Sequence, residues 1–231
     1  MTDDPNWTEQ EIEARANEIP AYVPPLPGID PYISQAPGLF AEEHAVRFGA
    51  SLARAAMVAG TAAAMVATMV GFLGTGEHPS NHNFITVEYS RDVAPSPIGD
   101  GAWCDMAVSV AASRSGNIVA VCGGPRRGFA YTIAHAQDFK RRGLWTNSLH
   151  GIGPGCVVFF SWSRGKSISS IEHVGVVEHV YADGTIATDE GNIGDLCRRE
   201  HRDSTYVVGY GRPPYGSADA DGRAIVVSLG A

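Results

Sequence analysis

The chain has 231 residues, 44% of them hydrophobic, which gives room for one full domain with an appendage and for a buried core. Its formal net charge of −8 argues against non-specific binding to nucleic acid, because such binding needs clustered basic residues to displace counterions from phosphates. Its four cysteines form no C-x-x-C pair and have no zinc-ligand spacing, so neither a disulfide framework nor a zinc site is indicated.

The N-terminal region has neither the basic start nor the apolar stretch of an ordinary signal peptide. Thr8 and Glu11 are spaced as in a capping box and predict a short helix over residues 8–16. Six prolines from Pro20 to Pro37 then argue against regular helix or central strand and favour an extended arm. We interpret residues 1–40 as this arm, which is either a disordered linker or a segment that contacts another protein.

Residues 55–76 form an uncharged run that is long enough for a transmembrane helix. Much of the run is alanine, however, and Gly60, Thr61 and Thr68 interrupt it, so its apolar transfer energy is far below that of a Leu/Ile/Phe segment. We therefore expect one or two buried helices that pack closely through small residues, and no stable insertion into a membrane.

A cysteine follows a glycine-containing turn and opens a small, apolar run at residues 101–109, which predicts that residues 100–113 form a helix and the turn before it. A thiol at a helix N-terminus lies beside unpaired backbone N–H groups and the positive end of the helix dipole, which favour its reactive thiolate. Cys104 is therefore a candidate nucleophile. The alternative is a buried structural cysteine, which is the commoner role of this residue type.

Helical periodicity predicts a further helix over residues 129–142, closed by Gly143. Strands dominate after this helix, and Asp183-Gly184 is the strongest local signal for a hairpin turn. The sequence predicts an antiparallel set of strands over 157–162, 171–181, 185–190 and 204–211, with one more edge strand over 224–229.

A two-residue turn at Asp183-Gly184 would place Gly175 opposite Asn192. Because side chains alternate between the faces of a strand, His173, Glu190 and Asn192 would then share one face. This simple register makes Asn192 the closer neighbour of His173.

Four segments, in their order and spacing, resemble the CHAP family of cell-wall amidohydrolases and peptidases, relatives of the NlpC/P60 group within the papain-like cysteine hydrolases. They are WCDMAVS at 103–109, GPGCVVFF at 153–160, HVGVVE at 173–178 and EGN at 190–192. The resemblance covers roughly residues 65–215. It departs at Cys156, where the family usually has Asp, and we interpret this change as a matter of local stability.

The resemblance implies an α+β, papain-like fold with N-terminal helices packed on a central antiparallel sheet. The arm at 1–40 would precede a catalytic domain over 41–216, which begins with the Ala-rich helix, and a tail would follow over 217–231. The implied activity is cleavage of an amide bond in the peptide of bacterial peptidoglycan, as in a phage or actinobacterial lysin.

The resemblance also implies the roles of the site residues. His173 would accept the thiol proton of Cys104, and Glu190 would orient His173 with Asn192 beside it, a pattern that a bulge near Gly191 would reconcile with the simple register. Trp103, Trp162 and Tyr181 are candidates to line a glycopeptide groove, although aromatic residues near such strands are more often core. No cofactor and no metal are expected, because the acidic calcium-ligand cluster that some relatives place before the cysteine is not evident at 96–100.

A narrow papain-like groove suits a thin peptide, so we favour an endopeptidase slightly over an amidase. The same residues could also transfer the acyl group to an acceptor other than water. The alternative is a non-catalytic CHAP-like binding or structural module of a phage particle, against which the retention of the four site residues argues. An enzyme without a signal peptide would reach the wall by lysis, by a holin-type route or on a virion. In the last case the N-terminal arm would contact other virion proteins.

Overall fold

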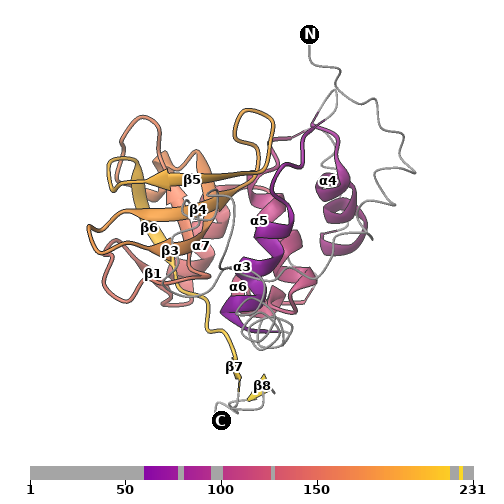
Figure 1. The fold of residues 1–231 in the computed structure, drawn as a ribbon, viewed down its shortest axis with the longest axis horizontal. Coiled ribbons are helices and arrows are strands. Elements are labelled where there is room, and N and C mark those ends of the chain that lie inside the picture. The colour runs from indigo at the N-terminus through magenta and orange to yellow at the C-terminus, as the bar shows by residue number, and fades with distance from the viewer. Residues whose placement is uncertain (1–59, 78–80, 95–100, 126–127, 219–223, 226–231) are drawn as a thin grey trace, which may run out of the picture.

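The computed structural model describes residues 60–77, 81–94, 101–125, 128–218 and 224–225, and these form a helical layer beside a β-sheet (Figure 1). The predicted α+β fold, with helices packed on an antiparallel sheet, is confirmed. The predicted N-terminal arm, the predicted short helix at 8–16 and the first part of the Ala-rich run lie outside the described residues, as does most of the predicted strand over 224–229.

Helix α5 (Cys104–Arg114) is the centre of the helical layer. It packs against α3, α4, α6 and strand β3, and every residue from Cys104 to Ala112 is buried. A helix that is apolar or small on all sides is suited to such a position, because its neighbours can approach from every direction. The other helices are α3 (Ala62–Gly71), α4 (Phe84–Glu88) with the π-helical turn η2 (Tyr89–Val93), α6 (Ile118–Cys122) and α7 (Thr132–Arg141).

The Ala-rich run contains helix α3, which begins after Thr61, whose side chain accepts a hydrogen bond from the amide of Ala64. The helix has only ten residues, five of them buried. Across the described ranges, the structure has no helix with the length and apolar character needed to cross a membrane.

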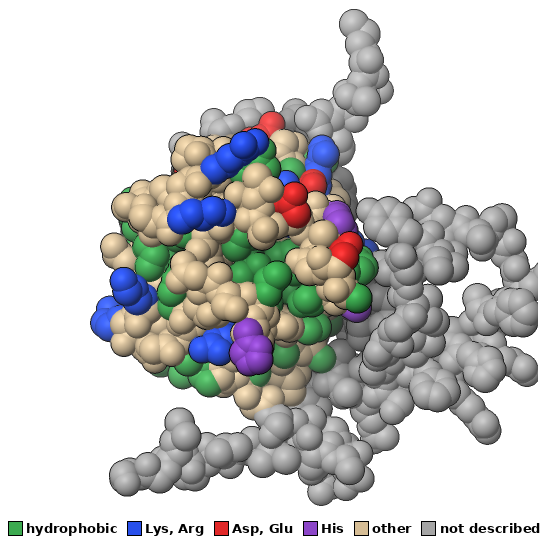
Figure 2. All heavy atoms as spheres, turned by 90° about the vertical axis from the view of Figure 1, so that its left-hand side faces the viewer, with side chains coloured by type: hydrophobic (Ala, Val, Ile, Leu, Met, Phe, Trp, Pro, Cys, Tyr) green, Lys and Arg blue, Asp and Glu red, His purple; other side chains and the backbone are tan. Residues whose placement is uncertain are grey.

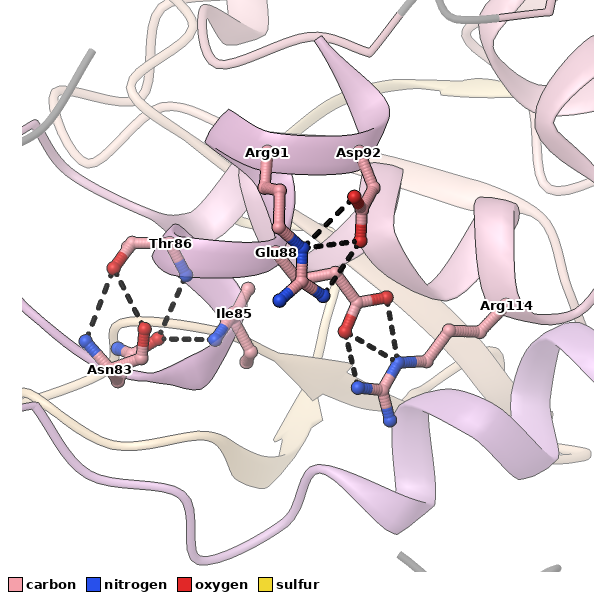
Figure 3. Close-up of polar contacts among 7 residues, drawn as sticks. All are labelled: Asn83, Ile85, Thr86, Glu88, Arg91, Asp92 and Arg114. Carbon is pink, nitrogen blue, oxygen red and sulfur yellow. Dashed lines mark hydrogen bonds and ion pairs between the residues drawn. The ribbon is translucent and has the colours of Figure 1, made fainter. Parts of the chain in front are cut away.

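Polar contacts fix α4 against α5 (Figure 3). Asn83 and Thr86 cap the start of α4 reciprocally: the Asn83 side chain accepts from the Thr86 amide at 3.1 Å, and Thr86 Oγ1 accepts from the Asn83 amide at 3.1 Å. At the other end, Arg114 of α5 donates from Nε to both carboxylate oxygens of Glu88, at 2.9 and 3.0 Å. A paired and partly buried Arg–carboxylate contact of this kind positions the end of α5 more firmly than an exposed pair would.

The main sheet has six strands in the order β1-β6-β2-β3-β4-β5, and every neighbouring pair is antiparallel. Strands β1 and β5 were not predicted, and a separate two-stranded sheet of β7 (Ser217–Ala218) and β8 (Ala224–Ile225) takes up the end of the described chain. The strand bounds are β1 Trp145–Thr146, β2 Val157–Phe160, β3 His173–Val180, β4 Ile186–Glu190, β5 Arg198–Arg202 and β6 Val207–Gly211.

Alternating residues of the sheet serve two separate cores. Val157, Phe159 and Val174 belong to the large cluster that also contains the helices, whereas Val158 and Phe160 belong to a smaller cluster on the other face. Figure 2 views the molecule from its sheet side and shows hydrophobic side chains gathered near the centre of this face, with charged side chains around them. Both faces of β2 are therefore buried, as its unbroken apolar run suggests.

The hairpin between β3 and β4 differs from the predicted register. Gly184, with φ +85°, closes a three-residue turn in which its amide donates to Tyr181 O at 3.0 Å, so Val180 pairs with Ile186. A bulge between Val177 and His179 then shifts the pairing by one residue more, which brings Val177 opposite Thr188. The predicted pairing of Gly175 with Asn192 is therefore wrong, since continuing the observed register places Gly175 opposite Glu190.

Candidate functional site

Cys104 is the first residue of α5, as predicted, and its side chain is only 5% exposed. Burial, followed by the negative charge of Asp105, raises the pKa of the thiol to about 12, although the backbone amides of Asp105 and Val174 act in the opposite direction. The expectation that the helix terminus would favour a thiolate is therefore corrected, because desolvation outweighs the nearby amides. The thiol is protonated in the resting site at neutral pH.

His173 is the first residue of β3, the strand on which α5 packs. The Val174 amide that interacts with the Cys104 thiol belongs to the next residue in the chain, so thiol and imidazole share one end of β3. The ring Nε2 lies 2.9 Å from Glu190 Oε2. In the part of the chain that the structure describes, Nδ1 has no hydrogen-bond partner, and no hydrogen bond joins the ring to the Cys104 sulfur.

Glu190 ends β4, is completely buried and lies at the centre of a polar network. Its two oxygens accept from Arg202, at 3.0 Å from Nε and 2.9 Å from Nη2, and from Thr188 Oγ1 at 2.5 Å. Burial alone would raise its pKa, but the hydrogen bonds from His173 and Arg202 lower it below the usual value. Glu190 is therefore an ionised carboxylate held in one orientation against the imidazole.

The lack of a side chain at Gly175 leaves the space in which the Glu190 side chain reaches the His173 ring. A Cβ at this position would lie 2.6 Å from Glu190 Cγ and 3.1 Å from the backbone oxygen of Asp189. A side chain at position 175 would thus displace the carboxylate that contacts His173. The structure fills this space on the strand face with Glu190.

Asn192 takes a different place from the one that the simple register predicts. It adopts a left-handed backbone conformation with φ +60°, and no hydrogen bond from it to His173 occurs among the described residues. The bulge expected near Gly191 lies instead at the middle of β3. Gly191 packs directly on α5, since a Cβ there would lie 2.7 Å from Ala107 Cβ and 3.1 Å from the Trp103 ring.

The three predicted groove aromatics have three different environments. Trp103 is completely buried and its indole Nε1 donates to Glu77 at 2.7 Å, so it supports α5 from within the core and has no surface for a substrate. Tyr181 lies beyond the far end of β3, about 26 Å along the strand from His173, and packs against the rings of His179 and His201. Trp162 is 40% exposed, with its ring centroid 5.4 Å from that of His173.

Arg202 belongs to the candidate site and was not predicted from the sequence. It lies on β5 opposite Ile186, yet its guanidinium reaches Glu190 and covers the Phe160 and Trp162 rings, with centroid distances of 5.5 and 5.2 Å. Strand β5 has the sequence RREHR and no apolar face, so hydrophobic alternation gave no sign of it. The one feature that could have indicated Arg202 was that a buried carboxylate such as Glu190 needs a cation beside it.

A second acid–histidine pair lies under the cysteine. Asp105 and His135 are both fully buried, and Asp105 Oδ1 lies 2.7 Å from His135 Nδ1. The imidazole is stacked between Phe129 and Phe139, with centroid distances of 4.4 and 4.9 Å. Because Asp105 follows Cys104 directly, this pair ties the first turn of α5 to α7.

We expect His135→Ala to lower the free energy of unfolding by about 3–5 kcal/mol, because it leaves the Asp105 carboxyl buried without its partner and opens a cavity between two rings. Urea denaturation of the purified variant measures this loss. His150→Ala is the control, since His150 is exposed and its loss should change stability by no more than about 0.5 kcal/mol. A loss below about 1 kcal/mol for His135→Ala would contradict the structural role given to the pair.

Among known protein families, the CHAP domain matches the chain over residues 97–192. The matched segment begins just before α5 and ends at Asn192, so it contains Cys104, His173 and Glu190 but stops short of Arg202. Searches of the curated proteins and of the solved structures found no match. The predicted family resemblance is confirmed by this match.

Proposed function

We propose that the chain is a peptidoglycan hydrolase of the amidase or peptidase type, as its match to the CHAP domain implies, and that it acts through a cysteine acyl-enzyme. The observation that supports this mechanism best is the arrangement at the start of β3. The Cys104 thiol lies against the amide of Val174, and the adjacent His173 is oriented by an ionised, buried Glu190.

In the proposed reaction, Nδ1 of His173 accepts the thiol proton while the sulfur attacks the carbonyl carbon of a wall amide. The imidazolium then protonates the leaving amine, the C–N bond breaks, and a thioester to Cys104 remains. Water, deprotonated by the same imidazole, releases the acyl group and restores the thiol. Because the thiol pKa is raised to about 12, the proton transfer to His173 is required for attack at neutral pH.

The surrounding groups support this charge separation. Glu190 fixes Nε2 as the protonated nitrogen and stabilises the imidazolium, while Arg202 and Thr188 hold the carboxylate in place. The backbone N–H of Cys104 lies in the first turn of α5, where amides lack helical partners, and it is suited to stabilise the developing oxyanion.

Cleavage within the peptide is the preferred form of this activity. The groove of papain-like enzymes is narrow and admits a thin peptide, whereas an amidase must also seat the bulky muramoyl group next to the sulfur. Purified peptidoglycan digested with the wild type and with Cys104→Ala, followed by mass spectrometry of the new termini, tests this preference. New amino termini on peptides still attached to glycan support it, and free intact stem peptides would identify an amidase. New reducing sugar ends would exclude the cysteine mechanism.

We expect Glu190→Gln to lower kcat about 100-fold or more, because a neutral amide neither fixes the tautomer as well nor stabilises the imidazolium. Asn192→Ala should cost less than about tenfold, since no hydrogen bond links Asn192 to the ring within the described part of the chain. Steady-state rates on solubilised wall fragments measure both effects, with thermal unfolding as the control for folding. A larger loss for Asn192→Ala than for Glu190→Gln would identify Asn192 as the principal orienting residue.

A further inference from the structure

Next to His173 lies an aromatic and cationic surface formed by Trp162, Arg164 and Tyr206, which we call the Trp162 platform. We propose that the Trp162 platform binds a carboxylate-bearing part of the wall peptide beside the bond that Cys104 attacks. The guanidinium of Arg164 would bind the carboxylate, and the indole face of Trp162 would pack on the peptide. The choice of a wall peptide as the ligand rests on the proposed function.

The platform is continuous with the site. Ring centroids are 5.4 Å apart between His173 and Trp162 and 5.6 Å apart between Trp162 and Tyr206, and the Arg164 guanidinium carbon lies 5.6 Å from the centroid of Tyr206. Two ring-to-ring contacts and one cation–ring contact thus lead from the imidazole to the Arg164 guanidinium. An extended peptide advances about 3.3 Å per residue, so a stem of a few residues spans this path.

The turn that carries Trp162 is held in place by Glu172. The carboxylate oxygen Oε2 of Glu172 accepts from the amides of Trp162 at 2.7 Å and Ser163 at 3.3 Å. The Arg164 amide closes the turn on Ser161 O at 3.0 Å, and Arg164 has φ +62°, a conformation that is costly for a residue with a side chain. The turn therefore presents Trp162 and Arg164 in a defined geometry.

Lys166, which follows the turn of Trp162 and Arg164, holds the loop of Tyr206 against that turn. Its Nζ donates to three backbone oxygens, those of Ser204, Thr205 and Val207, at 3.2, 3.0 and 2.9 Å. Both halves of the platform are thus ordered before a ligand arrives, which removes the entropic cost of ordering them on binding.

The charges select the class of ligand. Arg202 is paired with Glu190, and Lys166 donates to backbone carbonyls. Arg164 is exposed and forms no ion pair with any residue that the structure describes, although its charge adds to the hydrogen bonds from Thr205 in lowering the pKa of the exposed Asp203 carboxyl. A guanidinium presents donors in a planar fork that matches a carboxylate. The stem peptides of peptidoglycan carry free carboxylates, whereas the N-acetylglucosamine units of its glycan strands are neutral. The cationic Trp162 platform therefore suits the peptide better than the glycan.

Binding can be measured without turnover on the full chain with Cys104→Ala. The probes are soluble muropeptides released from walls by a muramidase, either native or with their carboxylates converted to amides. Isothermal titration should show about tenfold tighter binding of the native muropeptides, and Arg164→Gln should abolish this difference. Trp162→Ala should weaken binding of both probes. The control is Lys140→Gln, which removes the same charge from an exposed position on α7 and should change neither affinity.

Equal affinity for native and amidated muropeptides would overturn the inference, as would a preference that survives Arg164→Gln or the absence of binding. Tight, Trp162-dependent binding of peptide-free glycan oligomers would make the platform a sugar subsite instead. The proposed function is tested separately, by the cleavage of the same native muropeptides. Cleavage that persists in Cys104→Ala would refute the cysteine mechanism and leave the binding result as it stands.

Discussion

Replacing Cys104 by serine should lower peptidoglycan hydrolysis by at least about 1,000-fold while leaving the fold intact. The hydroxyl is nearly isosteric with the thiol, so the buried first turn of α5 keeps its packing. A serine hydroxyl is far less acidic and less nucleophilic than a thiol, and His173 would have to remove a much less acidic proton. The decrease in turbidity of a wall suspension measures lysis, and thermal unfolding reports the fold.

Cys156→Ser provides a matched control for this substitution. Cys156 is also buried, but it precedes β2 and packs in the smaller cluster on the other side of the sheet from the helices. Its replacement should leave lysis within a few-fold of wild type. A folded Cys104→Ser variant that still lyses walls would refute the assignment of the nucleophile.

His173→Ala should be about as damaging as the loss of the thiol, because no other described group is placed to accept the thiol proton. Its residual activity should depend steeply on pH. Only the ionised thiol attacks in this variant, and below a pKa of about 12 the ionised fraction rises about tenfold for each unit of pH. Initial rates between pH 7 and pH 10 measure this slope.

The wild-type rate should not rise in this way with pH, since in the proposed mechanism the His173 imidazole removes the thiol proton. Stability has to be followed in parallel, because the pKa of Cys104 and that of the buried Cys122 are both raised to about 12. A thiol whose pKa is raised by folding favours the folded state at low pH, and this contribution is lost as the pH rises from about 9 toward 12. A flat pH profile for folded His173→Ala would contradict His173 as the base.

Much of the fold follows from local patterns in the sequence. The small apolar run after Cys104 and the periodic segment closed by Gly143 both form helices, and Gly143 has the expected positive φ. The apolar runs of β2 and β3 likewise form neighbouring strands. The candidate nucleophile and base could be named because each begins a regular element that local patterns define.

The hairpin register could not be read from the Asp183-Gly184 pair. A glycine with positive φ fits a two-residue turn and also the last position of a three-residue turn with a bulge, and the two differ by one residue in register. The second shift lies near Glu178, which pairs with Arg199 of β5. Because β5 itself was not recognised, the sequence contained no visible reason for a bulge there.

The missing parts of the site depend on tertiary contacts. Arg202 reaches Glu190 although the register places it opposite Ile186, which no spacing rule along the chain would predict. The raised pKa of Cys104 has the same origin, because the helix terminus is local to the sequence whereas the burial comes from strands far along the chain. Sequence patterns indicated the candidate reacting groups but not the groups that set their charges.

Gly191, which follows Glu190 of the sheet, packs closely on Ala107 and Trp103 of the helical layer. Activity should therefore depend on how closely the helical layer packs on the sheet. The proposed nucleophile, Cys104, belongs to the helices, whereas His173, Glu190 and Arg202 form a network that lies within the sheet. Partial denaturation that loosens the helices would leave this network assembled with no thiol beside it. Mild heat or denaturant should therefore inactivate the enzyme before circular dichroism registers any loss of strand structure, and inactivation should reverse when the layers close again.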